Sequence, residues 1–173
     1  MTRLRESMAL ERNMFMANEA VSYARSKLTI GASNKWKDIK KSGLESLICV
    51  PAVRSIEYIG QQTTELNFIR AVAAAAEHVG CGNCGENASI AFMYLFDRGV
   101  KPLDFMEGGA VDHAFVVVGR AISSTAGDPK TWGMDAVICD PWHEEGGAYY
   151  ASEFLNKMYK GEQMTPTVFY RAE

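Results

Sequence analysis

The chain contains 173 residues, of which 47% are apolar and 23% are charged, and its net charge at pH 7 is −3. A chain of this size is long enough to bury a hydrophobic core as one globular domain. The composition argues against a nucleic-acid-binding protein, because the most basic stretch, KWKDIKK at residues 35–41, is short and typical of a solvated helix face or loop.

The absence of targeting signals and the number of cysteines indicate which cellular compartments to expect. No apolar run approaches the roughly 20 residues that a transmembrane helix needs, so we expect no membrane span. Residues 1–16 lack the apolar core of a signal peptide, which predicts a cytoplasmic protein or export without a cleaved signal. Four cysteines are few for this length, and we expect free thiols in a reducing compartment rather than disulfides.

The first part of the chain is predicted to be mainly helical. Residues 3–28 contain no Gly or Pro and are rich in Glu, Arg, Met and Ala, which favours a helix. Residues 31–43 are expected to form a loop or a short, imperfect helix. Residues 44–50 are apolar and fit either a buried strand or a helix, which Pro51 is expected to end.

A further helix is predicted over residues 64–79. Thr63 or Thr64 can cap its first turn, and Gly80 can end it. Its apolar residues recur at helical spacing along one stripe, which indicates a helix with one buried face.

The stretch CGNCGENASIAFMYLF, which begins at Cys81, joins a glycine-rich turn directly to an apolar helix pattern. From Ala88 to Phe96 the apolar residues repeat at i, i+3, i+4, i+7 and i+8, and Gly99 is a natural stop. Four residues before Ala88 lies Cys84. The thiol of Cys84 is therefore expected in the first turn of this helix, on or near its buried face.

The second part of the chain is predicted to form most of a sheet. Residues 111–120 (VDHAFVVVGR) and 134–140 (MDAVICD) are apolar on both faces, which favours two central strands. Residues 151–161 fit a helix, and residues 165–172 a final strand. Helices followed by an antiparallel sheet with one late helix predict an α+β domain.

Cys84 has the surroundings that a thiol nucleophile requires. A helix N-terminus stabilises a thiolate through its partial positive charge and its unpaired N–H groups, which can also bind an oxyanion. Two other interpretations of the Cys81–Cys84 pair are weaker. A zinc site lacks a second pair of ligands at suitable spacing, and a redox pair would normally follow a strand rather than a helix. Cys81 is then most simply a packing residue.

His113 and Asp140 supply a candidate base and a candidate orienting acid. His113 lies among apolar residues near the start of one predicted strand, where its ring needs a hydrogen-bond partner. Asp140 ends the next strand, so antiparallel pairing can bring the carboxylate opposite the ring. The carboxylate would fix the tautomer of His113 and leave the other ring nitrogen to face Cys84.

The segments GNCGENA, DHAFVVV and VICDPW, in this order, resemble the papain-like cysteine hydrolases, and in particular compact bacterial effector or toxin proteases and glutamine deamidases. The resemblance covers roughly residues 80–145. It implies one papain-like domain over residues 1–173, with a helical N-terminal extension at 1–60 and a catalytic core at 61–173. It also implies a Cys84–His113–Asp140 triad, for which Asn83 is the nearest polar candidate as oxyanion donor.

The function implied is hydrolysis of an amide bond through a thioester, without a cofactor or metal, on a protein substrate. The substrate would be a host protein if the chain is an injected effector. A peptide bond, a glutamine side chain and transglutaminase-type transfer to an amine all remain open. A peptidoglycan amidase and a binding module without catalysis are the alternatives.

Overall fold

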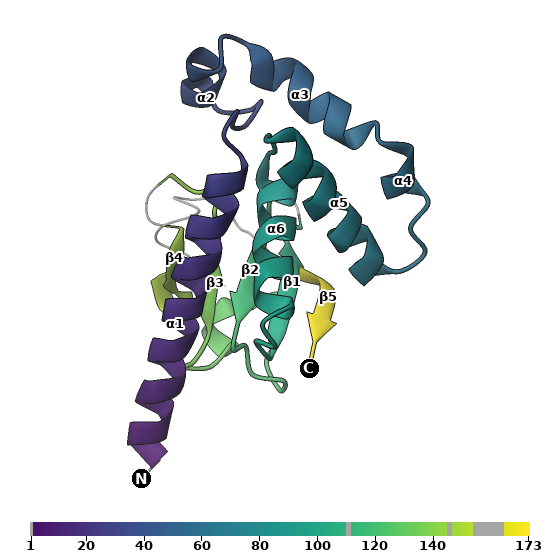
Figure 1. Cartoon of the computed structure of the whole chain (residues 1–173). Coiled ribbons are helices and arrows are strands. Elements are labelled where there is room, and N and C mark those ends of the chain that lie inside the picture. The colour runs from purple at the N-terminus through teal and green to yellow at the C-terminus, as the bar shows by residue number, and fades with distance from the viewer. Residues whose placement is uncertain (1, 110–111, 145–146, 154–164) are drawn as a thin grey trace.

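The protein is an α+β structure in which helices cover one face of an antiparallel sheet (Figure 1). The computed structural model describes residues 2–109, 112–144, 147–153 and 165–173. The helices are α1 (Thr2–Lys27), α2 (Trp36–Lys41), α3 (Glu45–Arg54), α4 (Glu57–Gly60), α5 (Glu65–Val79) and α6 (Cys84–Phe96). The strands are β1 (Leu103–Glu107), β2 (Ala114–Val118), β3 (Val137–Cys139), β4 (Ala148–Tyr150) and β5 (Thr167–Ala172).

The sheet has the strand order β4-β3-β2-β1-β5, with antiparallel pairing throughout. β2 is therefore the middle strand and β3 is flanked on both sides, which confirms the two predicted central strands. Alternate residues of β2 belong to two hydrophobic cores. Val116 and Val118 pack toward the helices. Phe115 and Val117 pack with Trp132 on the other face of the sheet. The continuous apolar run of β2 is explained by this burial on both faces.

Helices α1 and α6 lie side by side across the sheet (Figure 1). Small residues at the contact let the two backbones approach closely, since Ala17, Ala20 and Ala24 of α1 and Ala88 of α6 are all fully buried. The main core cluster also contains Cys49, Val50 and Val53, so α3 packs in the same core as α6 and the sheet. Within the described ranges, the structure contains no helix with the length and apolarity needed to cross a membrane.

The two long helices predicted from the sequence are confirmed as α1 and α5. Thr64 caps α5 by accepting a hydrogen bond from the Asn67 N–H at 3.3 Å, and Gly80 ends the helix with a φ of 88°. The expectation that Pro51 ends the apolar segment at 44–50 is wrong. This segment is a helix, and it continues to Arg54, because the N–H of Ser55 bonds the Pro51 carbonyl and the last turn stays closed.

Two strands in the structure carry no clear sequence signal. β1 contains Asp104, a fully buried carboxylate that accepts hydrogen bonds from Arg120 and Arg171. β4 is only three residues long and follows Gly147. The predicted helix over residues 151–161 lies mostly outside the described residues, and its first three residues, Ala151–Glu153, form a 3-10 turn.

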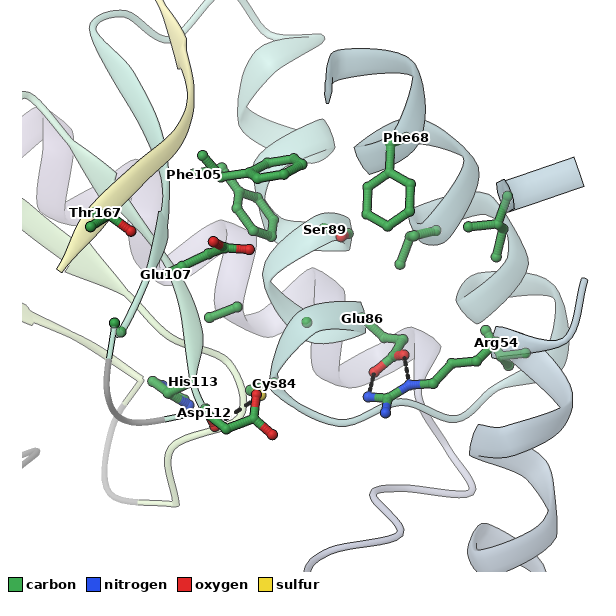
Figure 2. A pocket seen from close by; sticks show the side chains of 18 of the residues that line it. Arg54, Phe68, Cys84, Glu86, Ser89, Phe105, Glu107, Asp112, His113 and Thr167 are labelled. Carbon is green, nitrogen blue, oxygen red and sulfur yellow. Dashed lines mark hydrogen bonds and ion pairs between the residues drawn. The ribbon is translucent and has the colours of Figure 1, made fainter. Parts of the chain in front are cut away.

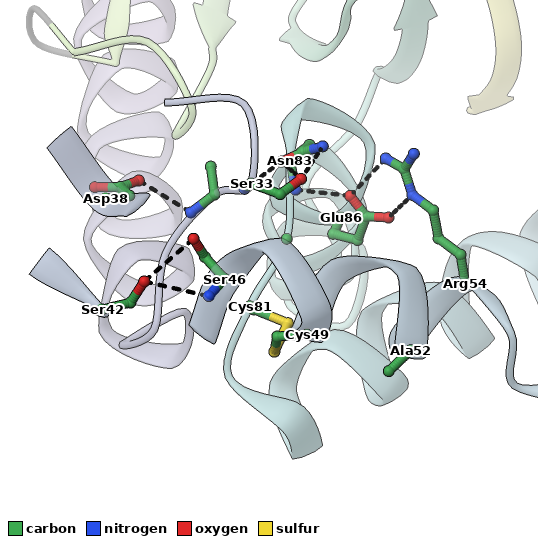
Figure 3. Close-up of a disulfide and its surroundings, with 12 residues drawn as sticks. Ser33, Asp38, Ser42, Ser46, Cys49, Ala52, Arg54, Cys81, Asn83 and Glu86 are labelled. Carbon is green, nitrogen blue, oxygen red and sulfur yellow. Dashed lines mark hydrogen bonds and ion pairs between the residues drawn. A yellow bond between two sulfur atoms is a disulfide. The ribbon is translucent and has the colours of Figure 1, made fainter. Parts of the chain in front are cut away.

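The expectation of free cysteines is wrong for half of them, because Cys49 and Cys81 form a disulfide (Figure 3). The bond joins α3 to the turn that precedes α6. Cys81 is therefore a bridged residue rather than a secondary packing thiol. Its partner lies 32 residues away in the sequence, and only the packing of α3 beside the turn brings the two Cα atoms to 6.2 Å. Cys84 and Cys139 remain free thiols.

Candidate active site

The turn that carries Cys84 is fixed by buried polar contacts. Asn83 is the N-cap of α6, and its N–H donates to the carboxylate of Glu86 at 2.8 Å. The side-chain amide of Asn87 donates to the carbonyl oxygens of Gly82 and Asn83, at 3.2 and 2.8 Å. These contacts close the turn around the first residue of the helix, so the position of the thiol is set by its own local sequence.

Arg54 reaches this turn from α3. Its guanidinium contacts both carboxylate oxygens of Glu86, at 2.8 and 3.2 Å (Figures 2 and 3). Glu86 is only 3% exposed, and the ion pair compensates its buried charge. The hydrogen bond to Glu86 raises the pKa of Arg54 despite its partial burial. Together with the Cys49–Cys81 bond, the ion pair attaches α3 to the turn on both sides of Cys84.

His113 and Asp140 form a buried hydrogen-bonded pair. Nε2 of His113 lies 2.7 Å from Oδ2 of Asp140, and the two side chains are 5% and 0% exposed. The other carboxylate oxygen accepts from the N–H groups of Trp142 and His143, at 3.1 and 3.2 Å. The antiparallel pairing of β2 with β3 places His113, just before β2, across from Asp140, just after β3.

Cys84 lies next to the imidazole of this pair. Figure 2 shows its sulfur next to His113 and Asp112, and the sulfur lies 4.0 Å from the Asp112 carbonyl oxygen. Burial lowers the pKa of His113, but hydrogen bonds and charge interactions with Asp140 and Cys84 raise it more, to about 9. The raised pKa favours the protonated imidazolium form of His113 at neutral pH.

Aromatic side chains cover the imidazole. The ring centroid of Trp142 lies 5.3 Å from that of His113, and the ring of Phe115 stacks on it at 5.9 Å. Trp142 is held in turn by its indole N–H, which donates to Asn34 at 3.1 Å. These rings shield the His113–Asp140 pair from water, which strengthens its electrostatic interaction.

Cys84 and His113 open into a pocket of about 640 Å³. One wall is apolar and aromatic, formed by Phe68, Phe105 and Phe169 together with aliphatic side chains of α3, α4 and α5. Charged groups at the pocket include Arg54, Glu107, Asp112 and Glu86. Gly85 also lines it, and no atom lies within 4 Å of where its Cβ would be, so a ligand backbone can come close to the thiol.

The four residues selected from the sequence do not all meet. Cys84, His113 and Asp140 lie in one row, whereas the side chain of Asn83 turns toward Ser33. Its Oδ1 accepts from the Ser33 N–H at 2.9 Å, and its Nδ2 lies 3.1 Å from the Ser33 hydroxyl (Figure 3). Asn83 is not among the residues that line the pocket. Its role as an oxyanion donor stays a prediction.

Sequence reasoning missed Arg54 and the aromatic wall. Arg54 lies 32 residues before its partner Glu86, and the phenylalanines come from α5, β1 and β5, so no local pattern connects them. Over the described part of the chain, no group of three or more His, Cys, Asp or Glu side chains is placed to hold a metal ion. No family model, curated protein or solved structure matches this chain.

Proposed function

We propose that this chain is a papain-like cysteine hydrolase that cleaves an amide bond through a covalent thioester. The observation that carries the proposal is the row of Cys84, His113 and Asp140, in which a thiol at a helix N-terminus meets an imidazole bonded to a buried carboxylate. Each group alone has an ordinary structural explanation. Cys84 and His113 line a pocket, and the alignment of the three groups supports triad chemistry.

In this proposal the two ring nitrogens of His113 have different roles. Because Nε2 of His113 bonds Asp140, Nδ1 is the nitrogen left for the sulfur of Cys84. The thiolate attacks the carbonyl carbon, and the imidazolium gives its proton to the departing nitrogen as the C–N bond breaks. Neutral His113 then takes a proton from water as the water attacks the thioester, and collapse of the intermediate releases the acid and the thiolate beside the imidazolium.

The developing oxyanion is bound by backbone donors in this proposal. The first N–H groups of a helix have no acceptor within the helix, and Cys84 is the first residue of α6. The N–H of Cys84 is the donor that we assign. A contribution from Asn83 would require its amide to leave Ser33.

The substrate that we propose is a protein. The aromatic wall of the pocket suits a side chain near the scissile bond, and the open space at Gly85 suits an extended backbone. The same thioester serves a peptide bond or a glutamine side chain, and an amine in place of water would give transglutamination. A host protein is the expected target if the chain acts as an effector.

Alkylation by iodoacetamide tests the nucleophile without knowledge of the substrate. Cys84 should react about tenfold faster than a model thiol near pH 7, because a thiol of pKa about 8.5 is only a few per cent thiolate there. His113→Ala should remove this advantage. Cys139 is the internal control, because it is a free thiol that is fully buried and should not react in the folded protein. A Cys84 thiol that reacts no faster than the model thiol would refute the proposal.

Mass spectrometry of candidate proteins identifies the reaction. Each candidate is incubated with the wild type and with Cys84→Ala. Chain cleavage indicates a protease, a one-dalton gain at glutamine indicates a deamidase, and an amine adduct indicates a transglutaminase.

A further inference from the structure

Helix α3 is apolar on the side that faces solvent as well as on the side that faces the core. Its inner side buries Cys49, Val50 and Val53. Its outer side carries an exposed stripe at helical spacing i, i+1, i+4 and i+5, and the exposed N-cap residue immediately precedes the helix. The N-cap residue and the stripe, together named here the outer α3 face, are Leu44, Leu47, Ile48, Pro51 and Ala52.

The exposure of this stripe is large. Ile48 is 76% exposed, Leu44 is 57% exposed and Leu47 is 44% exposed. α2, which contacts α3, adds Trp36 at 66% exposure. In Figure 1, α2 and α3 lie beyond α5 and α6, on the side away from the sheet. A helix that is apolar all round is normally buried, so the outer α3 face lacks a covering surface within the described structure.

The backbone at the start of α3 holds Leu44 in a strained position. Leu44 has a φ of 76° and is the one non-glycine residue with positive φ in the described part of the chain. Its N–H bonds the Ile39 carbonyl at 3.0 Å, which fixes the turn between α2 and α3. A leucine that is both strained and exposed contributes little to folding, and such residues are typical of binding surfaces.

Positive charge lies next to the outer α3 face. Lys37, Lys40 and Lys41 are all exposed on α2, whereas the acidic side chain of that helix, Asp38, accepts a hydrogen bond from the Ala32 N–H at 3.0 Å. Residues 36–54 contain one other acid, Glu45. This local excess of lysine opposes the net charge of the chain, which is −3. Apolar side chains beside lysines and a tryptophan match the layered chemistry of an anionic bilayer surface.

We propose that the outer α3 face docks on an anionic lipid surface. Leu44, Leu47 and Ile48 enter the boundary between headgroups and acyl chains, while the lysines of α2 contact the anionic headgroups. Trp36 lies at the interface, where an indole is favoured. The proposal is independent of the hydrolase assignment, because none of these residues lines the pocket at Cys84.

Vesicle sedimentation with the full chain tests this surface. The wild type should bind vesicles of phosphatidylcholine and phosphatidylserine at 0.1 M salt at least about tenfold better than phosphatidylcholine alone. Leu44→Asp/Ile48→Asp should abolish binding. A triple change of Lys37, Lys40 and Lys41 to Glu should reduce binding by about tenfold or more and remove its salt dependence.

Matched control variants distinguish binding through the outer α3 face from non-specific binding to vesicles. Phe15→Asp alters an apolar side chain of α1 that is 63% exposed, and Lys101→Glu alters an exposed lysine outside α2. Both variants should bind as the wild type does. Circular dichroism checks that each variant folds.

Several results would overturn the proposal. These are no binding by the folded wild type, equal binding to the two vesicle types, and binding that survives Leu44→Asp/Ile48→Asp. Sedimentation velocity supplies a further test, since a dimer that Ile48→Asp dissociates would assign the face to a second copy of this chain.

Discussion

The titration of His113 should make folding stability depend on pH in a defined window. The pKa of His113 is raised from 6.5 to about 9, because Asp140 and Cys84 stabilise the imidazolium by more than burial opposes it. A raised pKa in the folded state means that protonation favours folding. The contribution is fully present below pH 6.5 and is lost as pH rises toward 9. At about 1.4 kcal/mol per pKa unit, it amounts to about 3 kcal/mol.

The assay is urea unfolding of the wild type and of His113→Ala between pH 6 and pH 9.5. The difference between the two free energies of unfolding isolates His113 from the other titrating groups. This difference should fall by about 3 kcal/mol across the range and level off above pH 9. Asp140→Asn should shrink the fall, since it removes a principal cause of the raised pKa.

A constant difference over this range would contradict the electrostatic reasoning. It would mean that His113 titrates near 6.5 in the folded state and is neutral at pH 7.5. A difference in the free energies of unfolding that rises with pH would also contradict this reasoning, because it would require burial to lower the pKa of His113.

Three other perturbations test the structure around the site. Cys49→Ala/Cys81→Ala should lower the free energy of unfolding by about 4 kcal/mol, judged from a loop of 32 residues and measured by urea titration. Asp104→Ala leaves two arginines without their buried carboxylate and should cost about 3–5 kcal/mol in the same assay. Glu86→Gln should slow alkylation of Cys84, because the turn loses its charged contact with Arg54. An unchanged rate would show that the turn keeps its conformation without the charge of Glu86.

Local sequence patterns were sufficient for the elements whose burial is simple. α5 has one apolar stripe, α6 is buried on most of its sides, and β2 is apolar on both faces, so the apolar pattern of each element reflects its surroundings. The meeting of His113 and Asp140 could also be predicted, since it needs only that two successive strands pair antiparallel. Cys84 falls at a helix start because the glycine-rich turn and the apolar repeat join there.

Other features depend on partners that are distant in the sequence. β1 was not predicted, because Asp104 interrupts its apolar pattern and only Arg120 and Arg171 make its burial tolerable. Cys49 gives no sign of its bridge to Cys81, since its neighbours fit a strand as well as a helix. Asn83 points to Ser33 rather than into the pocket, and nothing near position 83 indicates this direction.

The sequence alone determined where the long helices and the two central strands form, which thiol begins a helix and which acid faces His113. Tertiary structure decided which cysteines pair, how Arg54 reaches Glu86 and which phenylalanines line the pocket. The physical reason is the distance along the sequence over which each interaction acts. Propensity, capping and periodicity act over a few residues, whereas a disulfide, a buried ion pair or a pocket wall forms only after packing joins segments that lie tens of residues apart.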